Sequence, residues 1–592
     1  MVTLRFHERR EPPEWALLER YLLRTMSEAA LEFVSRYTRE DGSLVWRSEW
    51  PGMDGSDDAY ESFHNLPLLA ALGGDPDVDT AARRCWEGVT QQFTQYGQVW
   101  REFDAYYDWM HHGESSLLFY FFGLARPEDN RMAGRARRFA EMYTGDDPLA
   151  RNYDRERRMV RSPINGSRGP RFVNTADDWL THRPVLANYP PPFEDVPGIA
   201  PDAPTADWTD DALFARILEL LNARMMRGDV PLNLAATSLV ANAYLYTGDE
   251  RYRDWVGEYI AAWVERAAAN GGVLPDNIGP SGEIGELMGG KWWGGYYGWR
   301  WPHGFLNLIE SALIAAANSL LLRHGTDALK LPRALLDRLH ALGRQEEGIW
   351  RTPHRHGDSG WYDFRPVDPS YAIYLWSWTL QEEDARRVDA WSPPDAPGGP
   401  LRPSQRQDTN LRAWYDFVHG RRPTYPVEVL RANCAEMLRR LERIRSDDGD
   451  PEEWDVHHWQ ELNPVVLEGL TQLTLGGPQP VYHGGLLQVP LRYRDPESGR
   501  PGLPADVAAL VSRVDTDGVT LTLQNVNAIR ERVVVVQAGA YGEHCVTHVT
   551  QNAKECALEA PAFAVTIGPG CAGTVTIGLR RHCRLPSYRL PG

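Results

Sequence analysis

Tyr246-Thr247-Gly248-Asp249 joins two stretches of the sequence, 232–246 and 250–269, in which apolar residues recur at helical spacing. The second stretch places four aromatic rings on one side of a helix: Tyr252, Trp255, Tyr259 and Trp263. Glycine ends a helix because it adopts the left-handed backbone conformation, and aspartate caps the first turn of the next helix. The segment therefore predicts a helical hairpin.

The same pattern, a glycine that ends one helix followed by an aspartate that caps the next, occurs at Leu72-Gly73-Gly74-Asp75 and at His324-Gly325-Thr326-Asp327. Helical patterns are predicted over 15–37, 60–72, 79–96, 111–124, 131–143, 211–227, 232–246, 250–269, 303–323, 328–342, 369–383, 409–419, 426–445 and 459–474. A repeated hairpin buries its apolar face only against its neighbours. The sequence thus predicts a mainly α domain over residues 1–480.

The composition changes near residue 480, where β-branched runs such as Val519 to Leu523 and Arg532 to Val536 follow at short spacing. We expect a C-terminal antiparallel β-sandwich over residues 481–592. Side-chain character alternates along residues 349–364, and a Gly/Asp/Ser turn interrupts the alternation. This pattern predicts a β-hairpin inserted into the helical domain.

The bulk composition excludes several classes of partner. The net charge is −18 and there is no long Lys/Arg block, which argues against nucleic acid and against an anionic membrane surface. The segment Met1 to Glu14 is polar, and the six cysteines form no CxxC pair, so we expect a cytoplasmic protein with reduced thiols. A leader removed earlier stays possible, and the oligomeric state is open. No phosphate-cradling loop or dinucleotide fingerprint is present, so we expect no redox cofactor.

Residues 282–303, GEIGELMGGKWWGGYYGWRWPH, combine glycines, aromatic rings, carboxylates and cations without any helical or strand period. Flat rings beside charged groups suit a carbohydrate cleft, since sugars present apolar C–H faces ringed by hydroxyls. We predict that this stretch lines the deepest cleft. The predicted substrate-binding residues here are Trp292, Trp293, Trp299, Trp301, Lys291 and Arg300. A packed aromatic loop is the alternative interpretation.

Two further stretches carry candidate site residues. Residues 100–114 contain Asp104, Asp108, His111, His112 and Glu114 just before an apolar helix, where capping is as plausible a role as function. The stretch 161–171 is basic within an acidic chain. It contributes Arg161, Asn165 and Arg168, and its guanidinium groups could hold a carboxylate, although the pattern slightly favours an ordinary surface loop.

His354, His356 and Asp358 alternate along an extended segment and so share one side of it. Such a set could coordinate a metal, but imidazoles in a hairpin are more often solvated. We predict no metal site, and the question stays open at these three residues.

The hairpins, the aromatic stretch 292–301 and the β-rich tail together resemble the alpha/alpha-toroid carbohydrate-active enzymes. The resemblance implies six helical hairpins closed into a ring with a β-domain beside it. The nearest similarity is to glycoside hydrolase family 154, whose members are β-glucuronidase-like. Toroids of this kind hold hydrolases, polysaccharide lyases and epimerases, so the fold leaves the reaction open.

Hydrolysis of a glycosidic bond requires one protonated carboxyl group and a second carboxylate that activates water or attacks carbon. We expect Glu286 to be the acid, because Leu287, Met288 and the tryptophans would raise its pKa. Glu283 is the alternative acid, and Asp104 or Asp108 is the base. The distance between the acid and the base carboxyl groups decides between inversion and retention of configuration, and the sequence does not give that distance.

Elimination from a uronate requires a base such as tyrosine or histidine and a cation on the carboxylate. Tyr296, Tyr297, His303 and Arg300 could supply this set. In either mechanism the cations Lys291, Arg300, Arg161 and Arg168 favour an acidic oligosaccharide or polysaccharide. The sequence favours the hydrolase over the lyase, and a non-catalytic carbohydrate-binding protein is the third hypothesis.

Overall fold

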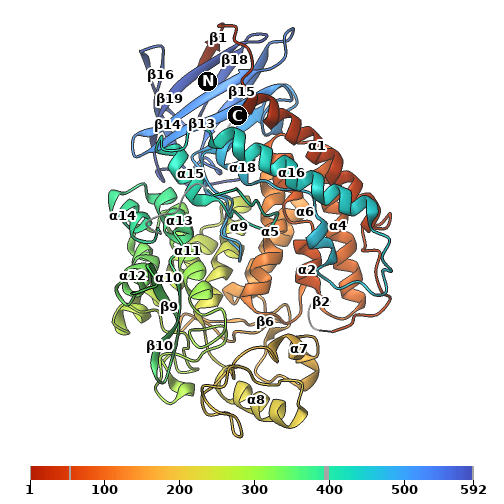
Figure 1. Cartoon of the computed structure of the whole chain (residues 1–592), viewed down its shortest axis with the longest axis vertical. Helices are drawn as coiled ribbons and strands as arrows, with labels where there is room; N and C mark the ends of the chain where they lie inside the picture. Colours follow the sequence, from red (N-terminus) through yellow and green to blue (C-terminus); the bar gives the residue numbers. More distant parts are fainter. Residues whose placement is uncertain (1, 53–54, 393–398, 590–592) are drawn as a thin grey trace.

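The computed structural model describes residues 2–52, 55–392 and 399–589. Helices dominate up to residue 475, and the strands of the C-terminal region lie together at one end of the molecule (Figure 1). The longer helices are α1 (Glu14–Tyr37), α4 (Pro76–Gln95), α5 (Trp109–Ala125), α6 (Asn130–Thr144), α8 (Asp211–Arg224), α9 (Ala236–Thr247), α10 (Glu250–Ala269), α11 (Phe305–Leu321), α12 (Lys330–Ala341), α13 (Ser370–Thr379) and α16 (Tyr425–Ser446). The shorter ones include α2 (Ser56–Glu61), α3 (Leu66–Leu72), α7 (His182–Leu186), α14 (Glu382–Ala390) and α15 (Leu411–Val418).

The hairpin of α9 and α10 confirms the capping pattern. Gly248 ends α9 with a φ of 67°, and the Asp249 side chain accepts a hydrogen bond from the backbone N–H of Arg251 at 3.1 Å. The four aromatic rings of α10 are at most 5 % exposed, so the face predicted to be apolar is buried. Local chemistry therefore fixes this hairpin, and packing of the rings stabilises it.

Contacts between successive helices run around the molecule. α5 packs against α9, α9 against α11, α11 against α13, and α13 against α15. α16 then packs along α1, so the first and last long helices meet and the succession closes. The helical architecture agrees with a ring, while the count of six hairpins stays a prediction.

Two predicted helices are broken in the structure. The stretch 60–72 spans the end of α2, a turn over 62–65 and α3. The stretch 459–474 forms α17 (His458–Leu462), then an extended turn at Asn463, then α18 (Glu468–Leu470) and a π-helical turn (Thr471–Leu475). Pro464 follows Asn463, and the residue before a proline is pushed out of the helical conformation. Apolar residues keep their helical spacing across the break, so the sequence pattern alone predicts one continuous helix.

The hairpin predicted at 349–364 is present as β9 (Ile349–Gly357) and β10 (Gly360–Pro366), which form a three-stranded sheet with β8 (Arg344–Glu346). Four short strands precede α7, as two small hairpins: β4 (Tyr153–Asp154) with β5 (Met159–Val160), and β6 (Asn165–Gly166) with β7 (Gly169–Pro170). A further pair, β2 (Val99–Trp100) and β3 (Phe103–Asp104), leads into α5.

The C-terminal strands form two five-stranded sheets. One has the order β1-β18-β15-β11-β12 and the other β13-β14-β19-β16-β17. Their bounds are β11 (Leu491–Asp495), β12 (Arg500–Pro501), β13 (Val507–Asp515), β14 (Gly518–Asn525), β15 (Arg532–Ala538), β16 (Cys545–Gln551), β17 (Lys554–Ala560), β18 (Ala562–Ile567) and β19 (Ala572–Arg580). The ring of Phe6 in one sheet lies against Gly573 in the other, so the sheets face each other.

Strand β1 (Thr3–Phe6) differs from the expected division of the chain. It pairs in parallel with β18, with Phe6 opposite Ile567, although the sequence assigned it to the helical domain. The remaining pairings of the two sheets are antiparallel. The domain boundary near residue 480 stays a prediction. Strand β1 precedes that boundary in the sequence but belongs to the C-terminal sheets.

Two general properties complete the description. All six cysteines lie in the described ranges and none is in a disulfide. Among the described residues, no helix combines the length and the apolar character needed to cross a membrane.

Candidate active site

The first turn of α5 holds an aspartate–histidine pair. Asp108 caps the helix by accepting from the backbone N–H of Met110, and its Oδ2 lies 2.8 Å from Nδ1 of His111. Burial opposes the charge on each group, but each stabilises the other. The pKa of His111 is therefore raised well above its usual value, and the pKa of Asp108 is lowered. His111 is thus an imidazolium whose orientation is set by Asp108.

The second part of the aromatic stretch meets this pair. The hydroxyl of Tyr296 donates to Oδ2 of Asp108 at 3.4 Å, and the ring of Tyr297 lies edge-on to His111 at 6.1 Å. On its other side Tyr297 stacks on His303, with ring centroids 5.7 Å apart and planes 17° apart. His111 and His303 therefore flank one tyrosine ring.

His303 has the opposite protonation state to His111. Burial, reinforced by the nearby charges of His483 and His111, lowers its pKa to about 4. It is a neutral imidazole over the physiological range, and its ring makes no hydrogen bond to another described residue. A neutral, partly buried histidine of this kind can accept a proton.

A third group joins helices α5 and α11. Nε2 of His483 lies 3.3 Å from Oε1 of Glu114, and its Nδ1 lies 2.5 Å from Oε2 of Glu310. Tyr371 donates to the same Glu310 at 3.3 Å. Burial works against the charge on His483, yet the two carboxylates raise its pKa to about 10. His483 is therefore held as a cation with both ring nitrogens engaged.

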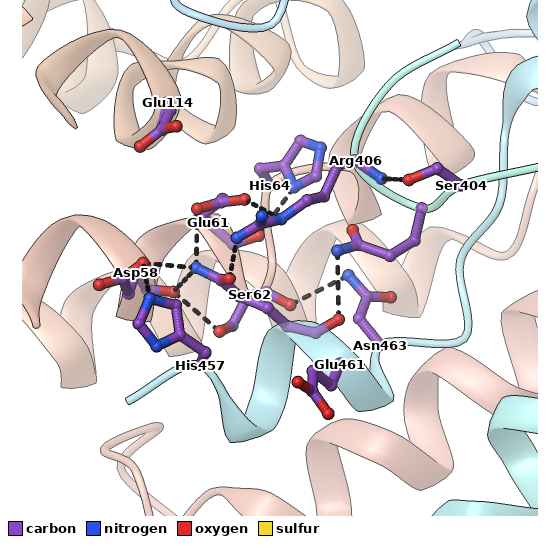
Figure 2. Close-up of polar contacts among 12 residues, drawn as sticks. Asp58, Glu61, Ser62, His64, Glu114, Ser404, Arg406, His457, Glu461 and Asn463 are labelled. Carbon is purple, nitrogen blue, oxygen red and sulfur yellow. Dashed lines mark hydrogen bonds and ion pairs between the residues drawn. The ribbon is translucent and has the colours of Figure 1, made fainter. Parts of the chain in front are cut away.

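Helix α2 contributes a fourth group. Oε1 of Glu61 lies 2.8 Å from Nε of Arg406, and its Oε2 accepts from Nε2 of Gln460 at 2.7 Å (Figure 2). Glu114 lies on the far side of Glu61 from these contacts in the same view. Burial, followed by the charge of Glu114, raises the pKa of Glu61 well above its usual value. Burial acts in the same sense on Glu114, but the interaction with His483 outweighs it and lowers that pKa.

A cavity of about 610 Å³ reaches the Asp108–His111 pair at Asp108. His111 and His303 are not among its lining residues. Asp108 and Tyr296 line it, and the rest of the wall mixes aromatic with polar side chains. The wall includes Trp50, Tyr106, Tyr107, Phe172, Gln98, Asn174 and Arg168. A cavity of this size, with flat rings and hydrogen-bonding groups, fits one or two sugar rings.

A buried carboxylate shapes the aromatic stretch. Asp276 is fully buried and accepts hydrogen bonds from the backbone N–H groups of Gly294, Gly295 and Trp299, at 3.0, 2.8 and 2.6 Å. A side chain at Gly298 would begin only 2.2 Å from Oδ2 of Asp276. The glycine is therefore required by the close approach of the carboxylate, which holds Tyr296 and Tyr297 in place.

The structure brings six of the residues predicted from the sequence into this site: Asp108, His111, Glu114, Tyr296, Tyr297 and His303. Asp104 and His112 lie next to it. Asp104 accepts from Ser56 and lies 3.5 Å from Nδ1 of His112, whose Nε2 is 2.7 Å from the carbonyl oxygen of Asn165. Asn165 is fully buried, so its part is to hold the β6–β7 hairpin against α5.

The two carboxylates expected to serve as the acid lie elsewhere. Glu283 and Glu286 are exposed, and Oε2 of Glu286 accepts from the backbone N–H and hydroxyl of Ser281 at 2.8 and 2.7 Å. The expectation that tryptophans surround Glu286 is wrong, because the glycines on either side turn this segment outward. Its catalytic role stays a prediction without support from its surroundings.

The predicted cations of the stretch already have partners. Lys291 pairs with Asp358 at 2.6 Å near the surface. Arg300 is buried, lies 3.6 Å from Glu194, and donates to the carbonyl oxygens of Pro191 and Pro201, so it anchors the proline-rich connection. Arg168 differs from both: it lines the cavity, and its guanidinium lies 5.6 Å from the ring of Trp100.

The four tryptophans do not line the cavity. Trp299 and Trp301 are 0 % and 4 % exposed and belong to the core, so the prediction that they are stacking walls is wrong. Trp292 packs on His356 with ring centroids 4.6 Å apart. Trp293 lines a separate, smaller pocket. Of residues 283–303, Tyr296 is the one that lines the 610 Å³ cavity, and the prediction that the stretch lines the deepest cleft stays a prediction.

His354, His356 and Asp358 do not converge. His354 packs on Phe305 and His356 on Trp292, while Asp358 turns outward to Lys291. Within the described ranges no three histidine, cysteine or acidic side chains are placed to hold a metal ion. Arg161 lies 5.5 Å from the ring of Phe172, a cavity residue, and so stands at the edge of the cavity.

Four residues of the site were missed by sequence reasoning: Glu61, Glu310, Arg406 and His483. Glu61 and Glu310 lie within helical patterns, where a single acidic residue gives no signal. His483 stands in Tyr482-His483-Gly484-Gly485, an aromatic–histidine–glycine run like that of the predicted stretch, and this could have identified it.

Comparison with known proteins identifies the family. A family profile matches residues 5–351 and 342–471, well over half of the chain. The chain belongs to the DUF8034 family. That family is described as a domain of unknown function, and none of the curated proteins compared with this DUF8034 chain is similar to it.

Two solved structures are similar in outline. A D-mannose isomerase is 10 % identical, with a TM-score of 0.37, over 64 % of this chain and 86 % of the other. A cellobiose 2-epimerase from Bacillus thermoamylovorans B4167 is 9 % identical, with a TM-score of 0.37, over 62 % of this chain and 85 % of the other. Similarity this low carries no argument about function, which has to rest on the residues of the DUF8034 chain itself.

Proposed function

We propose that the protein is a carbohydrate-processing enzyme that transfers protons at a carbon atom of a sugar, with His303 as base and His111 as acid. The observation that carries the proposal is the opposite protonation of these two histidines on either side of Tyr297. Groups whose surroundings drive their pKa values apart are suited to the roles of acid and base.

In this reaction His303 takes the proton from a C–H bond next to a carbonyl or carboxyl group. The electron pair moves into that group, whose oxygen receives the proton of His111. Return of a proton to either carbon gives an isomer or epimer. If a neighbouring C–O bond breaks instead, the proton of His111 goes to the leaving oxygen and a double bond forms. His483 and Glu114 would position these groups and balance their charge.

The cavity supports a sugar as the substrate. Its wall combines the rings of Tyr106, Tyr107 and Phe172 with the amides of Gln98 and Asn174, which suits C–H faces and hydroxyl groups. Arg168 is the feature that favours an acidic substituent, because it reaches the cavity and forms no ion pair with another described residue. Lys291 and Arg300 give no such support.

The test is isotope exchange. The full-length protein is incubated in D₂O with a panel of aldoses, ketoses, disaccharides and uronates, and products are followed by NMR and mass spectrometry. We expect deuterium to enter at the carbon next to the carbonyl or carboxyl group. The His303→Ala variant should lose exchange while Lys330→Met, at an exposed lysine of α12, retains it. Turnover of a sugar without any deuterium at carbon contradicts the proposal.

Hydrolysis of a glycoside is the second candidate, and one observation favours it. Glu61 and Glu114 form a buried pair in which one pKa is raised and the other lowered, as an acid and a base require. Against this, Glu61 is 1 % exposed and both its oxygens face donors, an environment that suits a carboxylate. In H₂¹⁸O a hydrolase places ¹⁸O in the product, and Glu61→Gln should abolish this incorporation.

A further inference from the structure

A second pocket lies beside the first part of the aromatic stretch. It has a volume of about 240 Å³ and shares no lining residue with the 610 Å³ cavity. Residues 287–294 form one wall, and Phe193 to Asp195 with Arg224 form the other. Tyr296 lines the cavity and Trp293, three residues earlier, lines the pocket, so one loop serves both spaces.

The polar side chains around this pocket are fixed in position by ion pairs. Arg224 binds both oxygens of Asp195, at 2.6 and 2.7 Å. Lys291 binds both oxygens of Asp358, at 2.6 and 2.8 Å, and Nε1 of Trp293 donates to Asp358 at 3.3 Å. Because these side chains are already held in place, little of their conformational entropy is lost when a ligand binds to them.

Hydrogen-bonding capacity remains on the same groups. Oε1 of Glu194 accepts from the backbone N–H of Asp358, while Oε2 has no hydrogen-bond partner among the described residues. The ammonium of Lys291 has three N–H donors, and its side chain is 40 % exposed. Acceptor and donor thus stand beside a partly buried indole ring, the combination that binds a hydroxyl-bearing ring.

The charges around the pocket balance. The cations Lys291, Arg224 and Arg300 each face one of the carboxylates Asp358, Asp195 and Glu194. A site with balanced charges has no preference for an ionic ligand and favours a neutral one. We propose that this pocket, defined by Trp293, Lys291 and Glu194, is a second carbohydrate-binding site that takes a neutral sugar unit of a glycan.

The experiment measures binding, not turnover. The full-length protein is applied to an array of neutral gluco-, xylo-, manno- and chito-oligosaccharides, and a bound oligosaccharide is then titrated by calorimetry. We expect Trp293→Ala to weaken binding about 10-fold or more, since the stacking platform is lost. Glu194→Gln, which keeps the shape, should weaken it less. Trp15→Ala, in a partly buried tryptophan on α1, is the matched control and should bind as wild type does.

The outcomes separate this site from the proposed catalytic site. Binding that survives in His303→Ala but falls in Trp293→Ala supports the second site, even if no deuterium exchange is found with any sugar. If no neutral oligosaccharide binds, or if Trp293→Ala and Glu194→Gln both bind as wild type does, the inference is wrong. If Trp293→Ala fails to fold, as judged by circular dichroism, Glu194→Gln and Lys291→Met decide the question.

Discussion

The two ends of the stretch 282–303 look alike in sequence and differ in the structure. Both carry glycines, aromatic rings and charged groups. The first end, up to Trp293, lies near the surface, where Lys291 pairs with Asp358 and Glu286 accepts hydrogen bonds from Ser281. The second end places Tyr296, Tyr297 and His303 in a buried cluster with strongly shifted pKa values. Composition marks the whole stretch as a candidate site, but only the partners from other segments distinguish its two ends.

The largest effect is expected at Gly298, the glycine that allows Asp276 to approach the second end of the stretch. Gly298→Ala forces a methyl group to within 2.2 Å of the buried Asp276 carboxylate, and should destabilise the protein by about 3 kcal/mol or more. The measurement is urea unfolding followed by circular dichroism. Gly134→Ala on α6, where an added methyl group meets nothing, is the control and should be neutral or slightly stabilising. Equal stability of both variants would show that the contact with Asp276 is not essential.

Removal of the proposed base should affect activity without a large change in stability. His303→Ala should lower the rate of deuterium exchange by about 10²–10⁴-fold, because general-base catalysis is lost. In the wild type, activity should rise as the pH increases through about 4, where His303 becomes neutral. The measurement is kcat/KM against pH. If the fall of kcat/KM at low pH is unchanged in His303→Ala, the group that titrates is not His303.

The charge of His483 should affect stability in a pH-dependent way. Its folded pKa is raised to about 10, so the stability it contributes is complete below its unfolded pKa of about 6.5 and is lost as the pH rises through about 10. His483→Gln should therefore lower Tm most near pH 6 and least near pH 10. Thermal unfolding of both proteins across this range checks the prediction. A pH-independent difference in Tm would mean that packing, and not charge, is responsible.

The smallest effect is expected at the first end of the stretch. Glu286→Gln should leave deuterium exchange within about twofold of wild type, since Glu286 is exposed and its carboxylate accepts hydrogen bonds from Ser281 at the surface. The sequence favoured this residue as the acid of a hydrolase. A large loss of activity in Glu286→Gln would restore that assignment and overturn the division between the two ends.

Much of the helical part could be predicted from local signals. α10 begins and ends where the Asp249 cap and the Asn270-Gly271 turn place it, and α16 (Tyr425–Ser446) differs from its prediction by one residue at each end. These boundaries depend on side chains within a few residues of the helix end, so the sequence carries them directly. The break at Asn463 was missed because the apolar period continues across it.

The candidate site was predictable only in part, and for a physical reason. Asp108 and His111 are three residues apart on one helix turn, so their pairing follows from helix geometry. His483 reaches Glu114 and Glu310 from a segment 173 residues beyond the nearer of the two. The pairing of Lys291 with Asp358 spans 67 residues. Contacts of this kind come from the closure of the whole fold, and no local pattern reports them.

The parallel pairing of β1 with β18 has a consequence for how the chain folds. Thr3 meets Ala564, so β1 finds its partner only after the long intervening segment has been made. Contacts between such distant segments form slowly, because the loop between them must first be ordered. Until then β18 has an open edge along residues 562–567, all of them apolar or threonine and all buried in the finished protein. By pairing with this edge of β18, strand β1 protects it against pairing with other chains.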